Sequence, residues 1–140
     1  MGLHELRRDI HTVSMLTDHM VFCPKYRRPV LVGDIADECH VLLCKILYEL
    51  DCEIIRLAVA PDHVHIFFKY PPKYSVSYIA NRLKGATSRI LRQKFPELKA
   101  KVKNESLWSP SCFHGSVGQG WEVVETYIKN QLPSIANCSQ

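Results

Sequence analysis

Two histidines separated by one residue are the first feature of this sequence whose types and spacing suggest chemistry. His63 and His65 flank Val64 in the run HVHIFFKY. If this run is a β-strand, side chains at positions i and i+2 share one face, so the two imidazoles lie side by side. That arrangement suits a shared divalent metal ion. The pattern also arises by chance, and two solvent-facing strand histidines are the alternative interpretation.

A tyrosine and a glutamine form the second candidate pair. Tyr127 and Gln131 lie four residues apart within residues 121–132, which we predict to form the last helix. On a helix this spacing places both side chains on one face, one turn apart. They flank an apolar stripe that should pack inward, so a half-buried tyrosine at the edge of the core is the competing interpretation.

Basic and polar side chains gather in two further places. A loop after the first strand contains Lys25, Arg27 and Arg28, whose charges suit phosphate groups. A polar stripe at three- and four-residue steps on the second long helix consists of Asn81, Lys84, Ser88 and Arg92. Gly85 costs that helix about 1 kcal/mol relative to alanine, and close approach of a ligand backbone or another chain would explain it. An ordinary solvated helix face is the alternative.

The elements that must position these residues are predicted from hydrophobic periodicity and turn residues. The expected order is β-α-β-β-α-β followed by a terminal helix. We predict strands within 13–23, 53–60, 63–70 and 107–117, and helices over about 34–50, 75–94 and 121–132, with 99–105 as a charged loop. Strands 53–60 and 63–70 should pair as a hairpin.

Capping residues and apolar stripes refine the two long helices. Asp34 and Ser75 are expected as N-caps, with Asp37 in the first turn of the first helix and Pro96 ending the second. The first buried stripe is predicted to contain Ile35, Val41, Leu42, Ile46 and Leu50, and the second Val76, Ile79, Leu83, Ile90 and Leu91. The fold class is therefore α+β: a ferredoxin-like (RRM-like) antiparallel sheet with helices on one face and an extra C-terminal helix carrying Tyr127.

Composition is consistent with one globular domain spanning residues 1–140. Hydrophobic residues make up 46% of the chain and charged residues 23%, which excludes a disordered tail. The net charge of +4 permits an anionic partner without requiring one. The six cysteines include no C-x-x-C pair, so we expect free thiols rather than a structural zinc site. With no signal peptide and no membrane-length apolar run, a cytoplasmic location is expected.

Five segments of the chain resemble the TnpA-type single-tyrosine transposases of small bacterial insertion sequences, which belong to the HUH (histidine–hydrophobic–histidine) group. The resemblance covers most of the chain, and five segments in the family's order at the family's length make it specific. The segments are CPKYRRPVL (23–31), APDHVHIFF (60–68), NRLKGATSR (81–89), LWSPSCFHGSVG (107–118) and ETYIKNQ (125–131).

The resemblance implies a role for each matching residue. His63 and His65 correspond to the motif histidines and Gln131 to a third ligand of Mg²⁺ or Mn²⁺, while Tyr127 corresponds to the nucleophile. The implied activity is a transposase that cleaves and rejoins single-stranded DNA through a 5′-phosphotyrosine, at the hairpin ends of an insertion element. A homodimer is implied, with Tyr127 of one subunit able to serve the histidines of the other through a hinge at 118–120. His19 and His114 match no ligand position, so we expect structural roles for them.

Three alternatives stay open at this point. A domesticated nickase acting on chromosomal repeats, or a rolling-circle initiator, would keep the same histidines and tyrosine. A non-catalytic single-stranded nucleic-acid-binding module would share the fold, although no RNP-type aromatic run is present. A purely structural interaction protein would need none of this chemistry.

Overall fold

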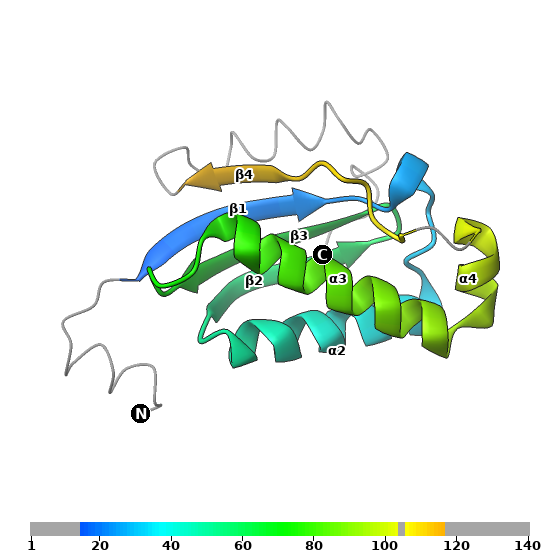
Figure 1. Cartoon of the computed structure of the whole chain (residues 1–140), viewed down its shortest axis with the longest axis horizontal. Helices are drawn as coiled ribbons and strands as arrows, with labels where there is room; N and C mark the ends of the chain where they lie inside the picture. The colour runs from blue at the N-terminus through cyan, green and yellow to red at the C-terminus, as the bar shows by residue number, and fades with distance from the viewer. Residues whose placement is uncertain (1–14, 104–105, 117–140) are drawn as a thin grey trace.

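The computed structural model describes residues 15–103 and 106–116, which form one four-stranded sheet with long helices packed on one face (Figure 1). Tyr127, Gln131 and the expected terminal helix and hinge lie outside the described residues. The described elements are β1 (Leu16–Phe22), the 3-10 turn η1 (Lys25–Arg27), α2 (Gly33–Glu49), β2 (Glu53–Ala60), β3 (His63–Tyr70), α3 (Val76–Lys94), α4 (Pro96–Val102) and β4 (Phe113–Ser116).

The sheet has the strand order β2-β3-β1-β4, and every neighbouring pair is antiparallel. The two central strands are β1 and β3. Strand β1 pairs with β3 and β4, and β3 pairs with β1 and β2. This arrangement confirms the ferredoxin-like α+β fold and the predicted hairpin of β2 and β3. The two strands that the sequence analysis placed at 53–60 and 63–70 have those bounds in the structure.

The core lies between the sheet and the helices α2 and α3, which run across the same face (Figure 1). The register pairs Met20 with Ile66 and Phe22 with Val64, so all four side chains point to this face. All four are at most 1% exposed. The opposite strand positions therefore face the other side of the sheet, and His63 and His65 are among them.

The first helix begins and packs differently from the prediction. Its N-cap is Val32, and Asp34 lies inside the first turn without capping, while Asp37 follows that turn. Val41 is 58% exposed instead of buried, because the buried positions follow a stripe to which it does not belong. That stripe consists of Ile35, Cys39, Leu42, Leu43, Ile46 and Leu47. Ser75 does cap α3, since its Oγ accepts a hydrogen bond from the Tyr78 N–H.

The segment after α3 is a helix rather than the predicted charged loop. Pro96 ends α3 but also occupies the first turn of α4, where its fixed φ and missing N–H are tolerated. Leu98 and Val102 lie four residues apart and are buried, which gives this short helix an apolar side. The fourth strand, β4, lies within the predicted range 107–117, and Gly115 is its second-last described residue.

Two features of composition have structural counterparts. The five cysteines in the described part of the chain are all free, and Cys39 and Cys52 are buried. Burial raises the pKa of both thiols to about 12, so they are protonated and unreactive at neutral pH. Within residues 15–103 and 106–116, no helix is long and apolar enough to cross a membrane.

Candidate functional site

His63 and His65 lie at the start of β3, on the sheet face opposite the helices. The register pairs them with Ala60 and Ala58 on β2. His63 is 4% exposed and His65 6% exposed. The two histidines therefore share a face as predicted, but they are buried, and the interpretation as solvent-facing strand residues is wrong.

Asp62, in the turn before β3, orients the first histidine. Its Oδ1 lies 3.2 Å from Nδ1 of His63, and both residues are buried. When the carboxylate accepts a hydrogen bond from Nδ1–H, the imidazole is held in the tautomer whose Nε2 has a free lone pair. Asp62 was not among the candidate residues predicted from the sequence, although a carboxylate next to a candidate ligand histidine was a usable signal.

Burial keeps both imidazoles neutral. It lowers the pKa of His65 to about 4, and the nearby side chains of His19, His63 and Arg56 act in the same direction. Burial also lowers the pKa of His63, although the hydrogen bond to Asp62 opposes this effect. A neutral imidazole is the form that coordinates a metal, so the donor chemistry of the pair fits a divalent cation at neutral pH.

The histidine pair is not a complete metal site by itself. In the described part of the chain, no group of three or more histidine, cysteine, aspartate or glutamate side chains is placed to hold a metal ion. His19 shares the face, but its ring packs on Phe67 with centroids 4.1 Å apart and lies 6.3 Å from the ring of His65. The expected third ligand, Gln131, lies outside the described residues.

The basic loop after β1 reaches the histidine end of the sheet. Arg27 Nη2 lies 3.9 Å from Oδ2 of Asp62, the same carboxylate that contacts His63. The backbone of Tyr26 and Arg27 has positive φ, which non-glycine residues rarely adopt. On the other side, Arg28 donates a hydrogen bond to the backbone carbonyl of Lys101 in α4. The loop therefore connects the histidine end with α4, and Lys25 begins it in η1.

The predicted polar stripe on α3 is only partly exposed. Asn81 is exposed and Arg92 half-buried, while Nζ of Lys84 lies 3.4 Å from the carbonyl oxygens of both Pro110 and Ser111. Ser88 departs from the prediction. It is 4% exposed, and its Oγ accepts a hydrogen bond from the Leu107 N–H at 3.0 Å. Ser88 therefore anchors the segment before β4 and does not present its hydroxyl to a ligand.

A buried contact next to Ser88 strengthens the same connection. Trp108 Nε1 donates to Oγ1 of Thr87 at 2.9 Å, and that hydroxyl donates to the Leu83 carbonyl at 2.7 Å. The Trp108 ring meets Phe22 of β1 edge-on, with centroids 4.7 Å apart. The segment that leads to β4 thus packs against both α3 and the sheet. Local sequence patterns did not predict these contacts.

A family model described as "Transposase IS200 like" matches residues 12–131, a range that includes the histidine pair, α3 and the segment with Tyr127 and Gln131. The chain belongs to the IS200-like transposase family. The resemblance identified from sequence motifs is thereby confirmed. The alternative of a purely structural interaction protein is not supported for a chain that matches this family over most of its length.

Curated relatives and solved structures agree with this assignment. The transposase is 33% identical to the ISDra2 transposase TnpA of Deinococcus radiodurans over 128 residues, 91% of each chain. It is 34% identical to the IS200 transposase of Salmonella typhimurium over 122 residues, 87% of this chain and 80% of that one. A crystal structure of a Deinococcus radiodurans transposase superimposes with a TM-score of 0.75 at 32% identity, covering 85% of this chain and 92% of that one.

A more distant structure shares the fold alone. It is described as a REP-associated tyrosine transposase bound to a REP hairpin, and it matches with a TM-score of 0.56 at 13% identity over 84% of this chain and 65% of that one. In this transposase, His19 lies in β1 and His114 lies in β4. His114 Nδ1 lies 3.3 Å from Oδ2 of the buried Asp18, so it bridges two strands on the helix-covered face.

Proposed function

We propose that this transposase cleaves and rejoins single-stranded DNA at the ends of an insertion sequence, with Tyr127 as the nucleophile. The observation that supports it most directly is the buried pair of neutral histidines, one of them oriented by Asp62. Metal-binding histidines commonly have such a carboxylate partner, which fixes the tautomer and the orientation of the ring. Family membership supplies the reaction class.

His63 and His65 would hold a divalent cation together with Gln131, with Mg²⁺ or Mn²⁺ as the candidates. Imidazole ligands favour Mn²⁺ somewhat over Mg²⁺. When bound, the cation would polarise a non-bridging oxygen of the scissile phosphate. Asp62 keeps the His63 ring in place, and the burial of both histidines limits the access of bulk water to the pair.

The cleavage step is a transesterification. The phenolic oxygen of Tyr127 forms a new bond to phosphorus, and the bond between phosphorus and the 3′-oxygen breaks. The proton lost by the phenol balances the proton that the departing 3′-oxygen gains, so the products are a 5′-phosphotyrosine and a 3′-hydroxyl. Free tyrosine has a pKa of about 10, so this proton must be removed as the bond forms. The phosphodiester is conserved, and rejoining is the reverse step with no nucleotide cofactor.

A homodimer is the smallest assembly that can exchange two DNA ends, because each chain supplies one tyrosine. Single-stranded hairpin DNA is the proposed substrate, which agrees with the description of the distant structure of the same fold as hairpin-bound. Lys25, Arg27 and Arg28 are proposed to contact phosphate groups near the histidines, because η1 contacts Asp62. Asn81, Lys84 and Arg92 are proposed contacts on α3; Ser88 is not, because it is buried.

The test is formation of a covalent adduct. Purified protein is mixed with Mn²⁺ and a hairpin strand that carries an insertion-sequence end and a label at its 3′ end, because the 5′-phosphotyrosine retains the 3′ fragment, and a denaturation-resistant protein–DNA band is measured. Tyr127→Phe should abolish the band, with Tyr48→Phe as the control because Tyr48 is an exposed phenol on α2. His63→Ala and His65→Ala should each reduce the rate at least about a hundredfold, since a metal ligand is lost.

His40→Ala is the matched control for the histidine variants, because His40 is exposed on α2. Melting curves establish that the variants remain folded. An adduct that persists in Tyr127→Phe would reassign the nucleophile. Tight hairpin binding with no adduct from the native protein at any Mn²⁺ or Mg²⁺ concentration would favour the binding module instead.

A further inference from the structure

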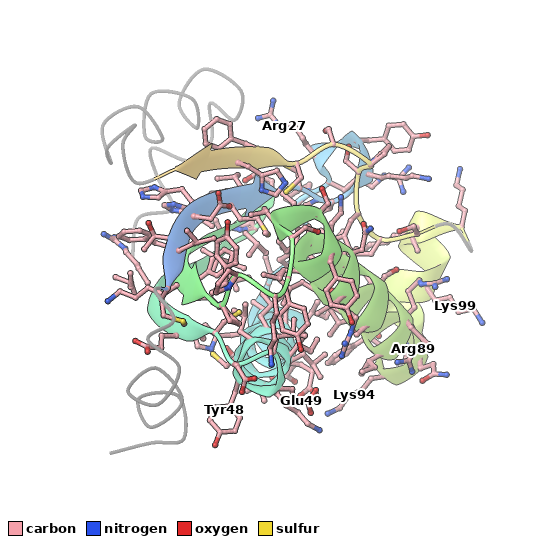
Figure 2. All side chains as sticks on the ribbon, turned by 60° about the vertical axis from the view of Figure 1, so that its left-hand side comes forward. Arg27, Tyr48, Glu49, Arg89, Lys94 and Lys99 are labelled. Atoms are coloured by element: carbon pink, nitrogen blue, oxygen red, sulfur yellow. The ribbon has the colours of Figure 1, made fainter. Side chains whose placement is uncertain are left out.

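A hollow of about 220 Å³ lies between the second half of α3 and α4, lined by Arg89, Arg92, Gln93 and Lys99. Arg89, Arg92 and Gln93 follow helical spacing on α3, and Lys99 faces them from α4. Figure 2 shows Arg89 and Lys99 extending outward from the same region of the molecule. Among the residues that the structure describes, three cations and one amide line the hollow, and no carboxylate does.

The cations of the hollow are not neutralised within the described residues, where none of the three forms an ion pair. Their neighbour Lys94 does, because its Nζ lies 3.0 Å from Oε1 of Glu38. Arg92 is also partly immobilised, since its Nε donates to the Ser88 carbonyl at 3.0 Å. Fixing Nε along the helix lowers the entropy lost when the rest of the guanidinium binds an anion.

A row of exposed residues on α3 leads to this hollow. Asn81, Gly85, Arg89 and Gln93 follow four-residue steps, and all four are exposed. A Cβ at Gly85 would meet no atom within 4 Å, so no contact within the described chain requires glycine there. The missing side chain lets an extended ligand lie close to the helix between Asn81 and Arg89.

The hollow and the histidine pair belong to different layers of the fold. The helix α3 covers one face of the sheet (Figure 1), and the strand register places His63 and His65 on the other. The two regions meet at one end of the sheet, where Arg27 contacts Asp62 and Arg28 binds the Lys101 carbonyl of α4. A ligand that occupied both would have to be long, negatively charged along its length and able to pass around the sheet edge.

We propose that the hollow binds a backbone phosphate of the DNA outside the segment being cut. This inference rests on the proposed function, because it takes the DNA substrate as given. Arginine side chains donate paired hydrogen bonds to phosphate oxygens, and Lys99 and the Gln93 amide add further donors. The phosphate held here cannot be the scissile one, because the sheet separates the hollow from the histidines. Its contribution is to affinity and placement of the DNA.

The experiment measures hairpin binding by Arg89→Gln and Lys99→Gln as a function of salt. Each variant removes one unpaired cation from the hollow. Lys45→Gln is the control, because it removes the same charge from an exposed position on α2. Each hollow variant should bind the hairpin roughly three- to tenfold more weakly at about 50 mM salt, and the slope of log K against log salt should fall by about 0.7–0.9. Lys45→Gln should leave both unchanged.

A second measurement separates this site from the site of cleavage. Both hollow variants should form the Tyr127 adduct at the native rate on a short single strand that contains only the cleavage site. A slower rate on that strand would place the two residues at the scissile phosphate and overturn the proposal. Unchanged affinity and salt slope for the hairpin, with normal adduct formation, would also overturn it while leaving the proposed function intact.

The reverse result is equally informative. If the hollow variants weaken hairpin binding while the native protein forms no adduct, the phosphate contact stands and the cleavage chemistry fails. Titration with inorganic phosphate alone provides the final comparison. Binding of free phosphate that the variants abolish, without any change in hairpin affinity, would identify a small-anion site and refute the DNA contact.

Discussion

Replacement of Asp62 tests the geometry of the proposed metal site. Its carboxylate Oδ1 lies 3.2 Å from Nδ1 of His63, and both side chains are shielded from solvent. Asp62→Ala leaves the His63 ring without its acceptor and free to turn or to change tautomer. Loss of such a carboxylate partner typically weakens metal binding about 10–100-fold. Asp62→Asn keeps an oxygen acceptor at the same position without the charge, so we expect the smaller loss, about tenfold.

The assay is the Mn²⁺ concentration that gives half-maximal adduct formation, with the electron paramagnetic resonance signal of free Mn²⁺ as an independent measure of binding. Asp62→Ala should raise both midpoints, while the rate at saturating Mn²⁺ recovers most of its native value. Asp51→Asn is the control, since Asp51 pairs with Lys73 away from the histidines. For Asp62→Ala, Mn²⁺ midpoints within about threefold of the native values would refute the positioning role. Loss of the group that orients a metal ligand should weaken metal affinity at least about tenfold.

Three further predictions concern stability and α3. Thr87→Val should lower the unfolding free energy in urea by about 1–3 kcal/mol, because the buried Trp108 N–H loses its acceptor, and a loss near zero would contradict that hydrogen bond. The interaction with Asp18 raises the pKa of His114 to about 9 from 6.5, so its contribution is complete below pH 6.5 and disappears as pH rises through 9. Urea unfolding should show a loss of about 1–2 kcal/mol between these pH values, reduced from the full shift by partial exposure, and His114→Asn should remove that slope. Gly85→Ala should raise the unfolding free energy by about 0.5–1 kcal/mol and weaken hairpin binding, whereas unchanged binding would exclude close passage of DNA over this position.

The partners in the Asp18–His114 pair respond differently to their surroundings. The pKa of His114 is raised because its charged form has a carboxylate beside it. The pKa of Asp18 is also raised, because burial outweighs the attraction of the histidine. The carboxylate therefore gains little stability from the pair, and the pH dependence that we predict belongs mainly to the histidine. This is also why the His114 variant, rather than an Asp18 variant, is the informative one.

The described structure also narrows the set of residues available to DNA. Ser88 is removed from the predicted contacts because its hydroxyl serves the Leu107 N–H, and Lys84 is partly engaged with the segment before β4. Arg89 and Lys99, which sequence spacing did not single out, line the hollow that we propose as a phosphate site. Arg89 lies one residue after Ser88, and that single step on the helix decides whether a side chain meets the core or the solvent.

The order and approximate bounds of the four strands and the two long helices, and the shared face of His63 and His65, were determined by the sequence alone. These features depend on local rules: alternation on a strand, three- and four-residue spacing on a helix, and capping by Ser75. The same motifs identified the family, and with it the expected roles of Tyr127 and Gln131. Local rules failed at Pro96, because proline ends one helix and is equally suited to the first turn of the next.

Only the tertiary structure decided the environment of the functional side chains. Burial of the histidine pair, the lowered pKa of His65 and the contact of Arg27 with Asp62 depend on groups brought together from separate strands and loops. The hollow between α3 and α4 likewise depends on the packing of the chain, because α4 brings Lys99 to the same hollow as Arg89. Solvation and charge pairing are properties of the packed chain, and neighbours in sequence do not specify them.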